Sequence, residues 1–197
     1  GAMVFKGKPD VVITKYRASM FGFQKIISAA IPVLEAASMK QHDDQPLQFG
    51  QLPPEHNIPN IDRRMGAGRC LIQGVGIYDA ITLTPVAEVV GGAEFILRIT
   101  VVNICVDEEM PLIVGYNLLG THGEDLCGVN TLMEPIDIFA PAKGSCITVR
   151  VKITLPYLAQ GNYALTVAVK IDEAASALAE DRVENAIVFG VRSPCNV

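Results

Sequence analysis

The stretch Gly144–Ile171, with the sequence GSCITVRVKITLPYLAQGNYALTVAVKI, decides the fold. Apolar residues occupy every second position in the segment Ile147–Leu155, and polar residues stand between them. The same alternation returns in Tyr163–Ile171, after a turn at Gln160–Asn162. Because the side chains of a strand point to opposite faces in turn, this pattern predicts two strands, each with one buried and one solvent-facing side. The polar turn between them predicts that they form a hairpin.

Further strands are predicted on both sides of this stretch. They have similar patterns and lie at Arg69–Asp79, Ile81–Glu88, Glu94–Val106, Leu112–Leu119, Leu126–Thr131 and Asn185–Arg192. About eight closely spaced strands with no helical stretch between them predict an all-β fold, an antiparallel β-sandwich over residues 66–197. A solenoid is not expected, because the sequence has no repeat of fixed period.

The first third of the chain has a different pattern. Pro9 and Asp10 suit the first turn of a helix, and the apolar residues that follow recur at three- and four-residue spacing up to Pro32. We interpret residues 1–39 as a tag remnant followed by an N-terminal helix. Residues 40–65 are polar and contain four prolines, so a Pro-rich linker is predicted there.

Composition excludes several classes of protein. The chain has 197 residues, half of them hydrophobic, which excludes a disordered protein, and its net charge of −5 gives no basic field for nucleic acid or anionic lipid. Its five cysteines form no C-x-x-C pair, so we expect neither a disulfide framework nor a zinc site, and a reducing cytoplasm is the simplest location. The most apolar early window, 21–39, contains charged residues and proline, so no membrane span is predicted.

No catalytic motif is present in the sequence. It lacks the phosphate loop, a dinucleotide-binding glycine motif after a strand, the H-E-x-x-H pair and the nucleophile elbow. The acidic run Asp107–Glu109, the segment His42–Asp44 and His122 are interpreted as solvated loop residues, since none has a partner at a fixed spacing. We therefore predict no enzyme activity, no metal site and no cofactor for this domain.

Several short motifs occur together, in order, in the β region. They are Gly115-Tyr116-Asn117-Leu118, Gly128-Val129-Asn130-Thr131, Leu155-Pro156, Gly161-Asn162-Tyr163 and Asp181-Arg182-Val183-Glu184-Asn185-Ala186, followed by Phe189 and Val191. Together they resemble the C-terminal domain of Wzt, the nucleotide-binding subunit of ABC transporters that export O-antigen polysaccharide. The resemblance covers roughly 66–191.

A second resemblance involves the N-terminal segment. Gly7–Val12 with Tyr16 is similar to the closing helix of polysaccharide-exporting ATPase domains. This implies that the chain starts where an ATPase domain ends, and that ATP and magnesium belong to that missing domain.

The first resemblance implies an immunoglobulin-like sandwich that forms a homodimer, with the C-terminal strand exchanged between protomers. The Ala-rich segment 173–180 is long enough for such an exchange, although the strand can equally fold back on its own sheet. The resemblance further implies a non-catalytic, carbohydrate-binding domain that recognises the modified non-reducing terminus of O-antigen. Its partners are then the polysaccharide and the transmembrane subunit of the transporter, at the cytoplasmic face of the inner membrane.

Alternation suggests where a sugar could bind. Arg98, Arg150 and Lys152 are predicted on the wet faces of their strands, and Thr100, Thr148 and Thr166 are expected to flank them if the strands adjoin. Asn117 is expected to face out beside Arg98 if their strands pair, and Tyr116 to pack inward. The chain has no Trp to form an aromatic platform, which favours a polar site for an anionic sugar or a phosphate cap.

Two alternatives stay open at this point. These polar residues could simply keep an outer sheet face soluble. The domain could also be a structural dimerisation module that holds two ATPase subunits together and binds no glycan.

Overall fold

The structure is a computed structural model and describes residues 52–107, 110–134, 136–171 and 179–194. The predicted N-terminal helix, the first part of the predicted linker and most of the Ala-rich segment lie outside these residues. Within the described ranges, no helix is long and apolar enough to cross a bilayer.

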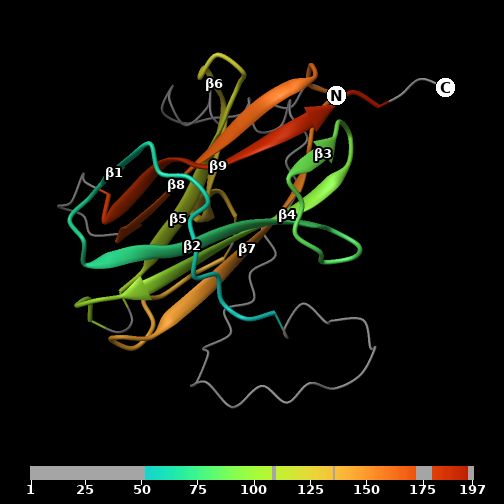
Figure 1. Cartoon of the computed structure of the whole chain (residues 1–197). Helices are drawn as coiled ribbons and strands as arrows, with labels where there is room; N and C mark the ends of the chain where they lie inside the picture. Colours follow the sequence, from blue (N-terminus) through green and yellow to red (C-terminus); the bar gives the residue numbers. More distant parts are fainter. Residues whose placement is uncertain (1–51, 108–109, 135, 172–178, 195–197) are drawn as a thin grey trace, which may run out of the picture.

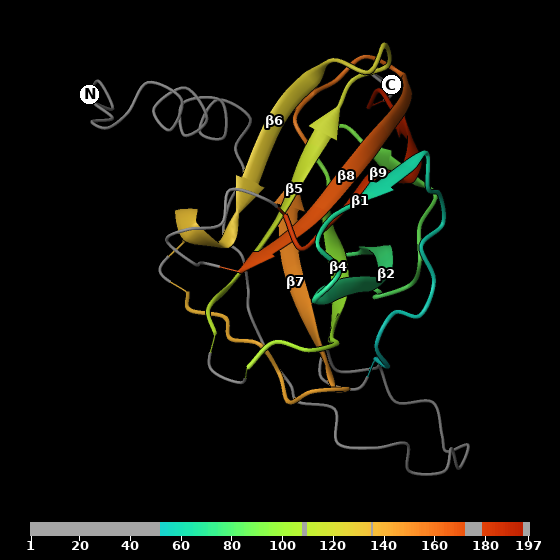
Figure 2. The ribbon, with the colours of Figure 1, turned by 90° about the vertical axis from the view of Figure 1, so that its left-hand side faces the viewer.

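Two β-sheets face each other. The larger sheet has the strand order β1-β9-β8-β5-β6, with β3 added in parallel to β9. Its strands are β1 (Arg63–Met65), β3 (Glu88–Val90), β5 (Leu112–Leu119), β6 (Asp125–Asn130), β8 (Gly161–Ile171) and β9 (Asp181–Arg192). The smaller sheet has the order β2-β4-β7, from β2 (Cys70–Asp79), β4 (Glu94–Asn103) and β7 (Cys146–Thr154). Figure 2 shows the larger sheet in front of the smaller one, and Figure 1 gives the course of the chain. A short 3-10 helix, η1 (Thr131–Met133), follows β6.

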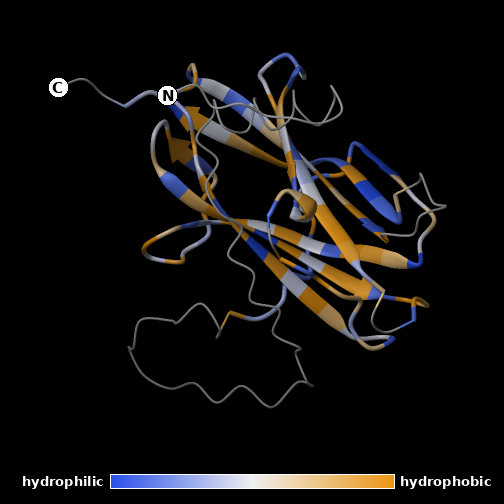
Figure 3. Ribbon diagram, turned by 180° about the vertical axis from the view of Figure 1, so that it is seen from behind, coloured by the Kyte–Doolittle hydropathy of each residue, from blue (hydrophilic) through white to orange (hydrophobic). Residues whose placement is uncertain are grey.

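The core lies between the sheets. Along β4, Phe95, Leu97 and Ile99 are almost completely buried and belong to one apolar cluster with the inner residues of β8 and β9. The rings of Phe95 and Phe189 lie 5.8 Å apart and join the two sheets. Figure 3 shows the alternation of hydrophobic and polar positions along the strands that produces this arrangement. The predicted all-β sandwich is confirmed.

The predicted hairpin is wrong. β7 pairs with β4 in the smaller sheet, whereas β8 pairs with β5 and β9 in the larger one. Both strands have an apolar face that packs in the core. β7 contributes it from the smaller sheet and β8 from the larger sheet. Alternation fixes the buried face of a strand and carries no information about its neighbour. The segment between them therefore crosses from one sheet to the other.

Two of the predicted strands differ most from the structure. Residues 81–87 form no named strand: Asp79 Oδ1 accepts hydrogen bonds from the N–H groups of Ile81 and Thr82, which makes a turn. β9 begins at Asp181 rather than at Asn185. The register shifts opposite Thr166, and Asn185 there adopts φ 54°, so the strand pairs on both sides of an irregularity.

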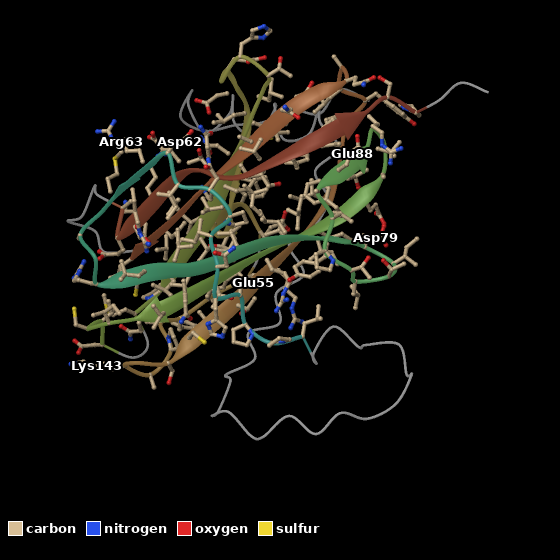
Figure 4. All side chains as sticks on the ribbon, viewed as in Figure 1. Glu55, Asp62, Arg63, Asp79, Glu88 and Lys143 are labelled. Carbon is tan, nitrogen blue, oxygen red and sulfur yellow. The ribbon has the colours of Figure 1, made fainter. Side chains whose placement is uncertain are left out.

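Part of the predicted linker belongs to the sandwich. We call residues 52–57 the strap, because they cross the outer face of the smaller sheet (Figures 1 and 4). The Glu55 N–H donates to Thr100 Oγ1 over 2.9 Å, and the Asn57 carbonyl accepts from Val75 N–H over 2.9 Å. A side chain at Gly74 would meet the Glu55 backbone at 2.4 Å, so glycine is needed there for the strap to approach.

The chain then passes to the larger sheet. The Asn60 N–H donates to the Ala186 carbonyl over 3.0 Å, and β1 pairs with the start of β9. Arg64 forms an ion pair with the buried Asp181 at 2.7 Å. Within this chain β9 pairs with β8, and exchange of the strand between protomers stays a prediction.

Candidate functional site

A groove of about 360 Å³ lies on the outer face of the larger sheet, over β6, β5, β8 and the start of β9. The inner residues of these strands are packed in the core, so the polar lining of the groove comes from the residues between them. Two rows of directly opposed residues cross it: Gly128–Asn117–Thr166, and Asn130–Gly115–Ala168–Arg182. Lys170 and Met133 also line the groove.

Small residues hollow out the floor. A Cβ atom at Gly128 would lie 2.6 Å from Asn117 Oδ1, and one at Gly115 would lie 2.8 Å from the Cβ atom of Asn130. Either contact is too close for an unshifted side chain. The two glycines therefore leave room for the two amide side chains, and Ala168 continues the low floor toward β9.

The amides are held by hydrogen bonds that leave part of their capacity free. Asn117 Nδ2 donates to Asp125 Oδ1 over 3.4 Å, and Asn130 Oδ1 accepts from Leu132 N–H over 3.1 Å. An amide group offers two donors and two acceptor sites, so both side chains can still bind hydroxyl groups in the groove.

Thr166 is fixed from the side of β9. Its Oγ1 accepts a hydrogen bond from the Asn185 N–H over 3.1 Å. Asn185 in turn donates from its side chain to Asp62, and its carbonyl accepts from Asn60 Nδ2 over 2.8 Å. The irregularity at Asn185 thus orients a hydroxyl at the edge of the groove.

Charge is distributed unevenly along the groove. Arg182 ends the second row and Lys170 lies beyond that row, whereas Asp125 lies beyond the first row. Within the described part of the chain, Lys170 forms no ion pair, and Arg182 contacts only Glu184, at 3.6 Å. The end near Lys170 can therefore accept an anionic group, while the other end suits hydrogen-bond donors.

Asn117 and Thr166, predicted to point outward, line this groove. Thr166 is only 3% exposed and lies in the larger sheet, so its predicted place beside the arginines on a wet face is wrong. Asn130, Lys170 and Arg182 were not predicted as site residues. Lys170 alternates with the core residues of β8 in the same way as Thr166, so the signal was present in the pattern. Asn130 and Arg182 stand inside motifs that carry the family resemblance, and those motifs by themselves do not indicate a binding role.

The other predicted site residues lie on the smaller sheet, away from the groove. Arg98, Arg150 and Thr148 point outward from the core as expected, but they are 2%, 7% and 8% exposed, so the prediction of a wet face is wrong. For Arg98 the reason is the strap, which crosses this face and contacts it. Lys152 remains partly exposed and forms an ion pair with Glu94 at 2.7 Å.

The expected neighbourhood of Asn117 and Arg98 is also wrong. β5 and β4 belong to different sheets, and the core separates the two side chains. Tyr116, expected to pack inward, is buried in the core, and this burial raises the pKa of its hydroxyl well above the ordinary value. Among the described residues, no three His, Cys, Asp or Glu side chains come together as a metal site.

Solved structures resemble the chain to different degrees. The crystal structure of the C-terminal domain of Wzt superposes with a TM-score of 0.61 at 16% sequence identity, covering 76% of this chain and 91% of that one. A putative β-galactosidase from Bacteroides fragilis reaches a TM-score of 0.40 at 12% identity, covering 62% of this chain and 17% of that one. No curated protein matches the sequence.

The family comparison agrees with the first of these structures. The family model described as the Wzt C-terminal domain matches residues 62–197, which include both sheets and every residue of the groove. The chain belongs to the Wzt C-terminal domain family.

Proposed function

We propose that this domain binds the modified non-reducing terminus of an O-antigen polysaccharide in the groove of the larger sheet, and so couples the finished chain to export by its ABC transporter. Membership of the family supports a carbohydrate-binding role in an O-antigen ABC transporter, carried out by a non-catalytic β-domain. The observation that carries the proposal is the groove itself, where two glycines and an alanine form the floor between amide, hydroxyl and cationic side chains.

The groove suits a sugar for chemical reasons. A sugar ring presents hydroxyl groups that both donate and accept, and the amides of Asn117 and Asn130 can match them in both roles. The low floor lets the ring approach the sheet. The volume of the groove falls within the range of small-ligand sites.

The terminal modification is assigned to the cationic end. Among the described residues Lys170 has no ion-pair partner, and Arg182 has only the long pair with Glu184 at 3.6 Å, so a phosphate or an acidic sugar is the cap that this end would bind best. In this proposal the anionic cap of the glycan is bound by residues of the larger sheet. From the sequence, Arg98, Arg150 and Lys152, which lie on the smaller sheet, were expected to bind it. The proposal also includes a homodimer and contact with the transmembrane subunit through the full-length ATPase, at the cytoplasmic face of the inner membrane.

The test is calorimetric titration of the purified domain with O-antigen chains from its own strain, with and without the terminal modification. Binding of the modified chain alone is expected. Asn117→Ala should weaken that binding about fivefold through loss of a neutral hydrogen bond, and Lys170→Met about tenfold through loss of a charged one.

The matched control is Asn162→Ala, which makes the same chemical change on the exposed surface of β8, outside the groove. Equal binding of both chains would contradict recognition of the terminus. No binding to either chain, with a stable dimer, would instead favour the structural dimerisation module.

A further inference from the structure

Two arginines lie side by side on the outer face of the smaller sheet. Arg98 of β4 and Arg150 of β7 are directly opposed in the antiparallel register, and both are more than nine-tenths buried. The next outward-facing pair is Thr100 and Thr148, whose hydroxyl oxygens are 2.8 Å apart. This face is therefore polar but largely withdrawn from solvent.

The charge of Arg98 is compensated, although its buried Nε, like that of Arg150, has no acceptor. Its Nη1 lies 2.6 Å from Glu55 Oε1, and its Nη2 donates to the carbonyl oxygens of Leu52 and Pro53 in the strap. The ring of Tyr78 lies 5.2 Å from the guanidinium carbon and adds a cation–π contact.

Arg150 has no such compensation. Within the described residues it forms no ion pair or hydrogen bond with another side chain or carbonyl group, and its buried Nε has no acceptor. The neighbouring Lys152 forms an ion pair with Glu94. Of the two buried guanidinium groups only that of Arg98 has a carboxylate partner, Glu55, and an unbalanced buried charge is strongly destabilising unless an anion approaches it. Desolvation, with repulsion from Arg98 as a smaller cause, lowers the pKa of Arg150.

We propose that Arg150, with Arg98 beside it, holds an oxyanion, a carboxylate or phosphate group, on the outer face of the smaller sheet. A planar guanidinium is well suited to bind such a group through two parallel hydrogen bonds. The site is distinct from the groove, which lies on the other sheet. It is independent of the proposed glycan function.

The oxyanion can come from two sources. One is a free inorganic anion. The other is the carboxylate pair Asp43 and Asp44 of this chain, which precede the strap in sequence; Leu52 and Pro53 bond to Arg98, so the chain enters the strap beside this site. The experiment separates the two sources.

The first arm measures thermal unfolding with increasing sodium phosphate, with ionic strength held constant by sodium chloride. If the anion is free, phosphate at ten times its dissociation constant should raise the Tm of the unmodified chain by about 4 °C. Arg150→Met should abolish this rise. Lys143→Met, which removes an exposed cation outside both this site and the groove, should leave it intact.

The second arm tests the chain's own carboxylates. If they fill the site, phosphate should leave the unmodified chain unchanged, and Asp43→Asn with Asp44→Asn should lower its Tm and make it responsive to phosphate. The same two changes should have no effect in the Arg150→Met background.

The proposal is overturned if neither phosphate nor the aspartate changes couple to Arg150. Should Arg150→Met fail to fold, Arg150→Lys replaces it; the loss of the planar fork should reduce the phosphate shift to less than half. Glycan affinity of Arg150→Met is expected to match that of the unmodified chain, so failure of this proposal and failure of the glycan proposal give different results.

Discussion

Replacing Glu55 by Gln tests whether the strap is anchored by the buried ion pair. The change keeps the shape of the side chain and removes its charge. Arg98 is 2% exposed and Glu55 15% exposed, so water cannot replace the lost carboxylate. Removing one partner of a buried pair leaves the other charge uncompensated, which costs about 3 to 5 kcal/mol.

We expect a value near the lower limit. Arg98 keeps its hydrogen bonds to the carbonyl groups of the strap, and the new amide oxygen can still accept from it. The expected loss of about 3 kcal/mol corresponds to a fall in Tm of about 9 °C for a domain of this size. Urea unfolding followed by circular dichroism, with a parallel thermal scan, measures both quantities.

The matched control lies on the same sheet. Glu94→Gln breaks the pair with Lys152, whose two members are 48% and 36% exposed, and should cost less than about 1 kcal/mol. Combining Glu55→Gln with Arg98→Met removes the stranded charge and should restore at least half of the lost stability. If Glu55→Gln costs no more than Glu94→Gln, the strap is not held by this pair and our account of its anchoring is wrong.

Three further results are expected. Gly128→Ala places a methyl group against Asn117 and should weaken glycan binding about tenfold by titration, whereas unchanged affinity would show that this amide is not used. Burial raises the pKa of Cys127 to about 12, so alkylation at pH 8 followed by mass spectrometry should label the exposed Cys105 in the folded protein and Cys127 only after unfolding. Asn185→Gly should unfold at a higher urea concentration than Asn185→Ala, by about 1 kcal/mol, because both lose the side-chain bonds but only glycine tolerates φ 54° without strain; equal midpoints would argue against this backbone conformation.

The alternation of residues predicts the strands of this sandwich well, and it predicts their partners poorly. In β8, apolar residues such as Leu165 and Val167 do face the core, as the pattern requires. The same pattern in β7 predicts a hairpin with β8, which is wrong, because the alternation of a strand is the same whichever sheet the strand joins. The predicted strand Asn185–Arg192 is shorter than β9 for a related reason. The irregularity at Asn185 breaks the period of two, and the residues before it no longer match the pattern.

Alternation predicts which residues point away from the core, but not how exposed they are. Asn117 and Thr166 point outward and line the groove, although Thr166 is only 3% exposed. Arg98 and Arg150 were chosen by the same rule and are buried, since alternation identifies residues that point away from the core and cannot show what covers them. The covering strap was hidden in a proline-rich segment, whose backbone bonds to the sheet leave no periodic signal in the sequence.

The route of the first described residues has a consequence for folding during synthesis. β1 depends on β9 for its backbone partner, and Arg64 depends on Asp181, which is separated from it by 117 positions. A ribosome adding about 5 to 20 residues per second needs roughly 6 to 25 s to make that stretch. Once β4 has been made, the strap can settle on it, whereas β1 must wait until Asp181 has been made, because its partner does not yet exist. Closure of the larger sheet is therefore a late event, and the nascent chain is most exposed to unwanted strand pairing just before its last strand emerges.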